Sequence, residues 1–234
     1  MPTDAAPALT VVLVHGLWHG SWSWDDVRAR LADEGVESVA PELPMQSLAG
    51  DAAVVSEVLD SIDKDVLLVG HSYGGAVVTV AGAHPKVARL VYLAGFLLDD
   101  GESISRVAPE QEIAPTALGD ALVVSADRGE VSVDPDRAVG LLYNRTDPDV
   151  AAAALARVRP VSRTLFSGRP EQLAWPARPS TYVICRDDRT VAPALQEIMA
   201  ARATTTLSWD SDHSPQASRP ADVAALLAGL ATMA

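Results

Sequence analysis

The stretch "VGHSYGG", residues 69–75, carries the clearest motif in the chain. It contains the pattern G-x-S-x-G with Ser72 at its centre. An apolar run, 66–69, precedes the serine and a helical pattern, 73–83, follows it. A strand, a sharp turn and a helix in this order form a nucleophile elbow, which exposes a serine for attack. The alternative is a glycine-rich turn with an ordinary capping serine. The flanking strand and helix favour the nucleophile.

Short apolar runs alternate with helical patterns along most of the chain. Strands are predicted at 9–14, 36–40, 66–69, 87–93, 182–185 and 205–207. Helices are predicted at 24–34, 51–62, 73–83, 193–202 and 219–231, with Asp51 and Ser72 at the N-cap positions of two of them. Runs that are apolar throughout indicate parallel strands covered on both faces. The sequence therefore predicts an α/β fold, with a mostly parallel sheet between two layers of helices.

One long segment interrupts this alternation. Residues 97–177 separate two predicted strands by far more than an ordinary crossover. Two helical patterns lie within it, at 136–143 and 148–158. Long insertions at the carboxyl edge of a sheet commonly form lids over binding sites. We therefore expect a helical cap at 97–177 on a core domain formed by 1–96 and 178–234.

Composition and charge narrow the classes of partner. The chain has 234 residues, of which 48% are hydrophobic, and this is enough for a sizeable core. Its formal net charge of -13 disfavours nucleic acids and anionic membranes as partners. Cys185 is the only cysteine, so no disulfide can form within the chain. The first ten residues, MPTDAAPALT, lack the basic region of a signal peptide. We expect a cytoplasmic protein, and the sequence indicates no oligomeric state.

A serine nucleophile needs a general base. His213 follows the last predicted strand and precedes the last helix, where it would meet the elbow at the same edge of the sheet. The other histidines lie beside the serine, in the loop after the first strand or at a helix end: His71, His15, His19 and His84. The side chain of His71 is expected to point away from its neighbour Ser72. We predict His213 as the base, the alternative being a loop histidine paired with Asp212.

An acid that orients this base should follow another strand, between the serine and the histidine in the chain. Asp187 and Asp188 both stand at such a position. Asp188 lies further into the loop, where it can turn toward His213, and it is the preferred candidate. Asp187 remains an alternative, and Asp99 and Asp100 after an earlier strand are the fallback.

Acyl transfer also needs donors for an oxyanion. One is the backbone N–H of the residue after the nucleophile, which is Tyr73 here. The other should come from the loop after the first strand, residues 15–20. The histidine and glycine that begin this loop allow the backbone to turn close to the elbow. The N–H of Leu17 is therefore the predicted second donor.

Four residues are candidates for contact with a substrate: Trp18, His19, Tyr143 and Trp175. For Trp18 and its neighbours Trp22 and Trp24, packing in the core and at its rim is the favoured alternative. Leucines and a phenylalanine in the expected cap suggest apolar walls. The chain shows no metal-ligand spacing and no phosphate loop, so we expect neither a metal nor a cofactor.

These motifs together resemble the α/β-hydrolase superfamily over nearly the whole chain. The elbow, His15-Gly16, Asp188 and His213 follow one another in the order of that family. Three longer stretches resemble the plant methylesterase and hydroxynitrile lyase group and its bacterial relatives: "VLVHGLWHGSWSW" (12–24), "LLYNRTDPDVAAAALARVRPVS" (141–162) and "YVICRDDRTVAPALQEIMA" (182–200). The resemblance implies six parallel strands, no initial antiparallel hairpin, a helical cap, and Asp188 rather than Asp187 as the acid.

Two chemistries share one triad in that group. The lyases resemble the esterases, but they have threonine where this chain has Gly16 and lysine where it has Ser214. Both departures favour ester hydrolysis, and serine at position 72 argues against a haloalkane dehalogenase. We predict a serine hydrolase that cleaves a small-to-medium, largely apolar carboxylic ester or lactone through an acyl-enzyme on Ser72. The alternatives are a cofactor-free lyase or peroxidase on the same triad, and a ligand-binding member of the fold without turnover.

Overall fold

A six-stranded parallel sheet forms the centre of the protein, as predicted. The computed structural model describes residues 8–108 and 110–233, so most of the N-terminal stretch tested for a signal peptide lies outside the described residues. The strands are β1 (Thr10–Val14), β2 (Ser38–Val39), β3 (Val66–His71), β4 (Val87–Leu93), β8 (Ser180–Cys185) and β9 (Thr205–Trp209). Their spatial order is β2-β1-β3-β4-β8-β9, and every neighbouring pair is parallel.

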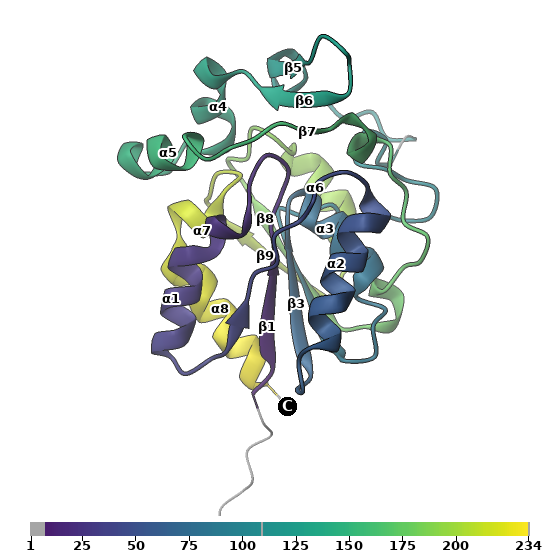
Figure 1. Cartoon of the computed structure of the whole chain (residues 1–234), viewed down its shortest axis with the longest axis vertical. Coiled ribbons are helices and arrows are strands. Elements are labelled where there is room, and N and C mark those ends of the chain that lie inside the picture. Colours follow the sequence, from purple (N-terminus) through teal and green to yellow (C-terminus); the bar gives the residue numbers. More distant parts are fainter. Residues whose placement is uncertain (1–7, 109, 234) are drawn as a thin grey trace, which may run out of the picture.

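Helices cover both faces of this sheet (Figure 1). They are α1 (Asp25–Asp33), α2 (Leu48–Asp60), α3 (Tyr73–Ala81), α6 (Pro193–Ala200), α7 (Pro215–Ser218) and α8 (Pro220–Thr232), and a 3-10 turn, η1 (Ser21–Trp24), precedes α1. In β1, Val11 and Leu13 pack with α1 and α8, whereas Val12 and Val14 pack with α2 and α3. Both faces of the strand are buried, which explains its unbroken apolar run. None of the described helices is long and apolar enough to cross a bilayer.

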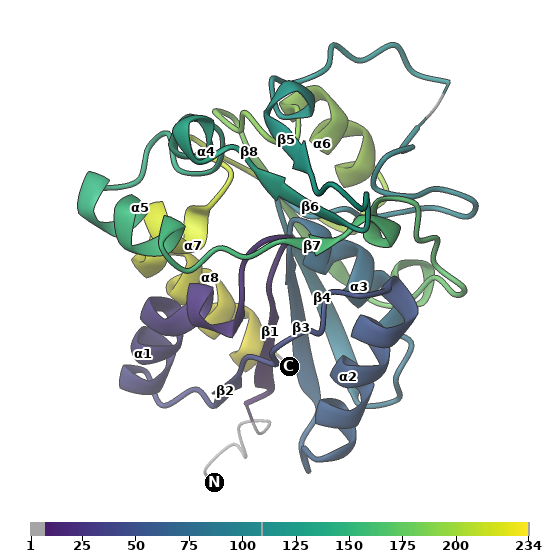
Figure 2. The same cartoon turned by 45° about the horizontal axis from the view of Figure 1, so that its top comes forward.

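The segment between β4 and β8 lies across the carboxyl edge of the sheet (Figures 1 and 2). It contains α4 (Pro135–Leu142) and α5 (Pro148–Leu155), close to the two predicted helices, and the short 3-10 turns η2 (Gly119–Ala121), η3 (Arg163–Phe166) and η4 (Trp175–Ala177). It also contains a small antiparallel sheet of β5 (Leu122–Val124), β6 (Glu130–Val133) and β7 (Val161–Ser162). These strands were not predicted from the sequence, because runs of two to four residues carry too little periodicity.

The apolar residues of this segment are continuous with the core. The leucines that suggested apolar walls belong to one buried cluster with the strand residues of β1 and β3, and Phe166 packs against that cluster; the leucines are Leu97, Leu98, Leu141, Leu142 and Leu165. The described residues of the segment therefore pack onto the sheet edge through a shared hydrophobic cluster and form no separate core.

The prediction that Asp51 caps a helix is wrong. Helix α2 begins earlier, and its N-cap is Ser47, whose hydroxyl accepts the Gly50 N–H at 3.1 Å. Asp51 lies in the first turn and is fully buried. Its carboxylate accepts the Met45 N–H at 2.9 Å and the Tyr73 hydroxyl at 2.7 Å. Burial raises the pKa of the Asp51 carboxyl above its usual range. Asp51 thus connects α2 to the residue that follows Ser72.

Two glycines allow three backbone segments to meet at the turn between β3 and α3. A Cβ atom on Gly70 would lie 2.4 Å from the carbonyl oxygen of Gly74. A Cβ atom on Gly74 would lie 2.4 Å from the carbonyl oxygen of Val14 at the end of β1. Since backbone atoms cannot yield as a flexible side chain does, neither position accepts a larger residue without displacement of the sheet edge.

Gly74→Ala should therefore lower the free energy of unfolding by at least about 2 kcal/mol, as expected for overpacking against rigid backbone. The matched control is Gly229→Ala in α8, where a Cβ atom would meet nothing within 4 Å. That change should raise the free energy of unfolding by about 0.5–1 kcal/mol. Urea unfolding followed by circular dichroism measures both values. Equal effects of the two substitutions would contradict this account of the turn.

Candidate active site

Ser72 lies at the sharp turn between β3 and α3 in a strained conformation. Its φ is 52° and its ψ is -122°, a region that residues with a side chain seldom adopt. Neighbouring backbone holds it there, since the Ser72 carbonyl accepts the N–H groups of Gly75 and Phe96, both at 2.9 Å. Ser72 occupies the N-cap position, as predicted, but its hydroxyl makes no capping hydrogen bond. Strain of this kind persists only where the surrounding structure imposes it and is frequent at functional sites.

His213 is paired with Asp188. The two atoms His213 Nδ1 and Asp188 Oδ2 are 2.7 Å apart, and both side chains are buried. The Asp188 carboxylate also accepts the N–H groups of Thr190 and Val191 at 2.7 and 2.9 Å, and the side-chain amide of Gln196 at 2.8 Å. Four donors therefore fix the carboxylate in one orientation. A carboxylate at Nδ1 leaves Nε2 of His213 as the nitrogen that can accept a proton.

The other acidic candidates lie elsewhere. Asp187 forms an exposed ion pair with Arg145, with Arg145 Nε 2.9 Å from its carboxylate. Asp99 accepts the backbone N–H of Asp100 at 2.8 Å in the loop after β4. The structure thus brings Asp188, and none of these three aspartates, to the ring of His213.

Asp212, the predicted alternative partner of His213, binds other residues. It is fully buried, and one carboxylate oxygen accepts the Arg145 N–H at 3.0 Å and the Thr146 hydroxyl at 2.9 Å. The other oxygen accepts the Ser218 hydroxyl at 2.7 Å. Because Arg145 and Thr146 belong to the insertion, Asp212 ties the insertion to the loop that carries His213.

His71 supports the loop that carries His213 through a hydrogen bond to its backbone. The sequence did not reveal this role. Its Nε2–H donates to the backbone carbonyl of His213 at 2.7 Å, since a carbonyl can only accept. Nδ1 of His71 is therefore the acceptor, and it receives the side-chain amide of Gln216 at 3.2 Å. Burial, together with the nearby His213, holds the pKa of His71 well below its usual range. His71 is thus a neutral ring that positions the 213–216 loop.

The loop after β1 comes directly against the elbow. A Cβ atom on Gly16 would lie 2.9 Å from Cβ of Ser72, so only glycine fits without a shift. The backbone N–H groups of Leu17 and Tyr73 donate to no acceptor among the residues that the structure describes. Both predicted oxyanion donors are therefore available beside Ser72. No hydrogen bond joins the Ser72 hydroxyl to the His213 ring within this described part of the chain.

His15 fixes the peptide group that carries one of these donors. Its Nε2 accepts the Leu43 N–H at 3.1 Å, which leaves the ring proton on Nδ1. That Nδ1–H donates to the Gly16 carbonyl at 3.0 Å. The Gly16 carbonyl and the Leu17 N–H belong to one peptide group, so this bond also polarises the Leu17 donor. Burial lowers the pKa of His15, which keeps the ring neutral for this contact.

His19 and Tyr143, two of the predicted substrate contacts, are bonded to each other. The Nδ1–H of His19 donates to the Leu17 carbonyl at 2.7 Å, and its Nε2 accepts the Tyr143 hydroxyl at 2.6 Å. Both residues are buried. Burial lowers the pKa of His19 to about 4, so the ring is neutral near pH 7. Their polar atoms therefore hold the loop after β1 against the segment between β4 and β8.

The two predicted tryptophan contacts also use their indole N–H groups within the protein. Trp18 donates to the Val131 carbonyl at 3.1 Å and packs near Phe166, with ring centroids 6.5 Å apart. It is 3% exposed and joins the loop after β1 to β6. Trp175 donates to the Leu98 carbonyl at 3.1 Å, and the hollow that it lines contains neither Ser72 nor His213. The structure therefore does not bring Trp175 together with the other candidates.

The sequence comparisons with known proteins agree on one family. A model described as the alpha/beta hydrolase family matches residues 11–226. The alpha/beta hydrolase nvfD of Aspergillus novofumigatus is 28% identical, with 90% of this chain and 91% of that protein covered. Methylesterase 7 of Arabidopsis thaliana is 27% identical, with 94% and 95% covered. The crystal structure of polyneuridine aldehyde esterase has a TM-score of 0.82 at 21% identity, over 96% of this chain and 99% of that one, and shows a shared fold.

The neutral state of His19 makes stability depend on pH. Between pH 6.5 and about 4, the unfolded chain binds a proton at His19 that the folded chain excludes, so the free energy of unfolding should fall as the pH falls through this window. His19→Gln should make this slope shallower by up to about 1.4 kcal/mol per pH unit. Ala152→Gln, at an exposed position of α5, should keep the wild-type slope. Urea unfolding at several pH values across the window measures the slopes, and an unchanged slope in His19→Gln would refute the assignment.

Proposed function

The chain belongs to the alpha/beta hydrolase family, and we propose that it is a serine esterase that works through an acyl-enzyme on Ser72. Its curated relatives include proteins named as esterases, which supports ester hydrolysis as the general activity. The observation that carries the proposal is the 2.7 Å bond between His213 and the fully bonded Asp188, in a loop that His71 holds beside the strained turn at Ser72.

The proposed cycle begins when His213 Nε2 takes the proton of the Ser72 hydroxyl. The Ser72 oxygen attacks the ester carbonyl, and the N–H groups of Leu17 and Tyr73 bind the oxyanion of the tetrahedral intermediate. The intermediate collapses, the alcohol leaves with the proton from His213, and the acyl group stays on Ser72. A water molecule then attacks this acyl group, with His213 again as the base, and releases the carboxylic acid.

Asp188 acts in this cycle through His213. Its carboxylate keeps the ring proton on Nδ1 and stabilises the imidazolium that forms when His213 accepts the serine proton. Four hydrogen-bond donors surround the buried Asp188 carboxylate and fix its orientation. Such pre-organisation means that little reorientation is needed during the reaction.

The geometry at Gly16 favours the esterase over the lyase alternative. The hydroxynitrile lyases that this chain resembles have threonine at this position. In this chain, a Cβ atom on residue 16 would lie 2.9 Å from Cβ of Ser72. A lyase-type loop would therefore need a different backbone path beside the elbow. Ser214 also replaces the lysine that follows the base in those lyases.

We further propose that residues 97–177 act as a cap over the ester site. Ser72 is 6% exposed and His213 is 1% exposed beneath this segment, so a substrate must pass it to reach them. The leucines that the segment contributes near the sheet edge are apolar. A small-to-medium, largely apolar ester or lactone is the substrate class that such surroundings accept.

The nucleophile can be tested by covalent labelling. A fluorescent fluorophosphonate should label the wild-type protein and should not label Ser72→Ala. Hydrolysis of p-nitrophenyl butyrate should fall by roughly 10⁴–10⁶ in kcat for Ser72→Ala, while the circular dichroism spectrum stays unchanged. A wild-type protein that is not labelled and does not hydrolyse this ester, but cleaves a cyanohydrin, would establish the lyase alternative instead.

The acid can be tested with two neighbouring substitutions. Asp188→Asn should lower kcat by about 10⁴, because an amide cannot stabilise the imidazolium or fix its tautomer. Asp187→Asn removes only an exposed ion pair with Arg145 and should leave kcat within about twofold. Steady-state rates with p-nitrophenyl butyrate compare the two proteins. The reverse order of effects would show that Asp187 is the acid.

A further inference from the structure

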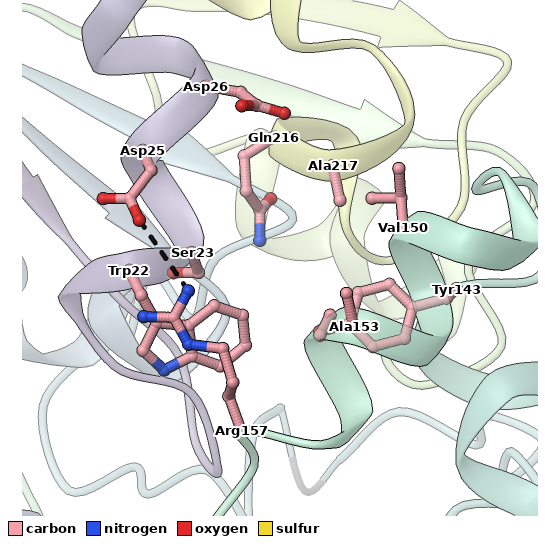
Figure 3. A pocket seen from close by; sticks show the side chains of 11 residues that line it. Trp22, Ser23, Asp25, Asp26, Tyr143, Val150, Ala153, Arg157, Gln216 and Ala217 are labelled. Atoms are coloured by element: carbon pink, nitrogen blue, oxygen red, sulfur yellow. Dashed lines mark ion pairs between the residues drawn. The ribbon is translucent and has the colours of Figure 1, made fainter.

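The two proposed oxyanion donors, the N–H groups of Leu17 and Tyr73, are held by different parts of the fold. Tyr143 lines the hollow between η1, α5 and α7 (Figure 3). Its hydroxyl donates to His19, and the His19 ring donates in turn to the carbonyl of Leu17. These contacts support the loop after β1, but they do not reach the peptide group of the Tyr73 N–H. The loop after β4 and strand β8 support that group instead.

The carbonyl of Ser72 and the N–H of Tyr73 belong to one peptide group. A trans peptide group is planar, and its C=O and N–H bonds point in opposite directions, so an anchor on one fixes the other. The Ser72 carbonyl accepts the Phe96 N–H at 2.9 Å, from the loop after β4. It also accepts the Gly75 N–H at 2.9 Å, but Gly75 lies in α3 and moves with the turn. The bond from Phe96 therefore ties the direction of the Tyr73 N–H to the loop after β4.

Tyr182 holds the peptide group that contains the Phe96 N–H. The carbonyl of this group belongs to Gly95, and it accepts the Tyr182 hydroxyl at 2.8 Å. The Leu97 N–H donates to the same carbonyl at 3.0 Å, but that bond stays within the loop. Because Tyr182 belongs to β8, its hydroxyl attaches the loop to the central sheet. Hydrogen bonds in series also polarise one another, which strengthens the last donor of the series.

The Tyr182 side chain is fixed in one orientation. It is fully buried, and its ring is stacked on that of Tyr92, with centroids 6.2 Å apart and an angle of 9° between the planes. Burial raises the pKa of the Tyr182 hydroxyl well above its usual range, so the hydroxyl remains a donor. The loop that it holds is strained, since Ala94 has a φ of 45°. Such strain persists only where neighbouring groups impose it.

We propose that Tyr182 is a positioning residue of the ester site: through its bond to the loop after β4, it fixes the direction of the Tyr73 N–H that binds the oxyanion. Tyr182 acts through two peptide groups and supplies no atom to the reaction itself. Its role rests on the proposed esterase function, because the direction of this N–H affects the rate only where an oxyanion forms. A well-directed N–H stabilises the transition state more than the bound ester. Loss of the hydroxyl should therefore lower kcat and leave KM nearly unchanged.

Tyr182→Phe removes the hydroxyl and keeps the ring. The Gly95 carbonyl retains the Leu97 N–H, so the substitution leaves no unpaired acceptor there and the variant should fold. With p-nitrophenyl butyrate, kcat should fall about tenfold and KM should stay within about twofold of the wild-type value. Removal of an oxyanion donor costs roughly 10²–10³ in kcat, and the expected loss is smaller because the Tyr73 N–H is still present.

Tyr92→Phe is the matched control. Tyr92 is stacked on Tyr182 and is equally buried, but its hydroxyl is bonded to Thr79, at 3.2 Å. Thr79 donates to the carbonyl of Gly75 in α3, which does not share a peptide group with the Tyr73 N–H. Both variants lose one buried hydroxyl and should lower the melting temperature by similar amounts. Tyr92→Phe should nevertheless keep kcat within about twofold of the wild type.

A trifluoromethyl ketone tests the oxyanion donors directly. The Ser72 oxygen adds to the carbonyl carbon of pentyl trifluoromethyl ketone, His213 takes the serine proton, and the carbonyl oxygen becomes an oxyanion. Pentyl methyl ketone has the same chain but is a poor electrophile, so it binds without forming this oxyanion. In Tyr182→Phe, the inhibition constant of the trifluoromethyl ketone should rise about tenfold, in parallel with the loss of kcat/KM. That of the methyl ketone should stay within about twofold.

The outcomes distinguish the role of Tyr182 from the esterase function. If the wild type hydrolyses the ester through Ser72 and Tyr182→Phe keeps its kcat and its affinity for the trifluoromethyl ketone, the esterase stands and the role of Tyr182 is refuted. Equal losses of kcat in Tyr182→Phe and Tyr92→Phe would also refute it, because they would reflect packing alone. A wild-type protein that neither reacts with a fluorophosphonate nor hydrolyses esters would refute the esterase and, with it, the role of Tyr182.

Discussion

Three backbone segments approach one another closely at Ser72, and this close approach positions the groups around the turn. Gly70 and Gly74 bring the end of β3, the start of α3 and the Val14 carbonyl of β1 within distances that leave no room for a Cβ atom. Gly16 then brings the loop after β1 against Cβ of Ser72. Because these contacts involve backbone, the position of Ser72 relative to the Leu17 and Tyr73 amides follows from the sheet itself.

The buried histidines around this turn have different roles, which follow from their hydrogen-bond partners. His15, His19 and His71 each donate a ring N–H to a backbone carbonyl, and burial lowers the pKa of each, so they act as neutral supports of loops. His213 alone among them meets a carboxylate, that of Asp188. A ring that must gain a proton needs a nearby negative charge, whereas a neutral ring needs only a carbonyl. All four residues are histidines, so the hydrogen-bond partner of each ring distinguishes the proposed base from the histidines that support loops.

The insertion takes part in the same network. Trp18 donates to β6, Tyr143 donates to His19, and Asp212 accepts from the loop between α4 and α5. Each of these bonds joins the insertion to a loop at the carboxyl edge that carries a proposed functional group. A shift of the insertion would therefore displace both the loop after β1 and the loop that carries His213. In this way a segment that supplies none of the proposed catalytic side chains still sets their positions.

Apolar runs, helical periodicity and G-x-S-x-G are local patterns, so the α/β sheet, its helices and the elbow could be predicted from the sequence alone. Motif order predicted that Asp188 and His213 would meet, and the structure places His213 Nδ1 2.7 Å from the Asp188 carboxylate. The contact of buried Asp51 with Tyr73 and the support of the 213–216 loop by His71 become visible only in the folded chain. These contacts join residues far apart in the chain, and their direction depends on how loops turn back over the sheet, which no local pattern encodes.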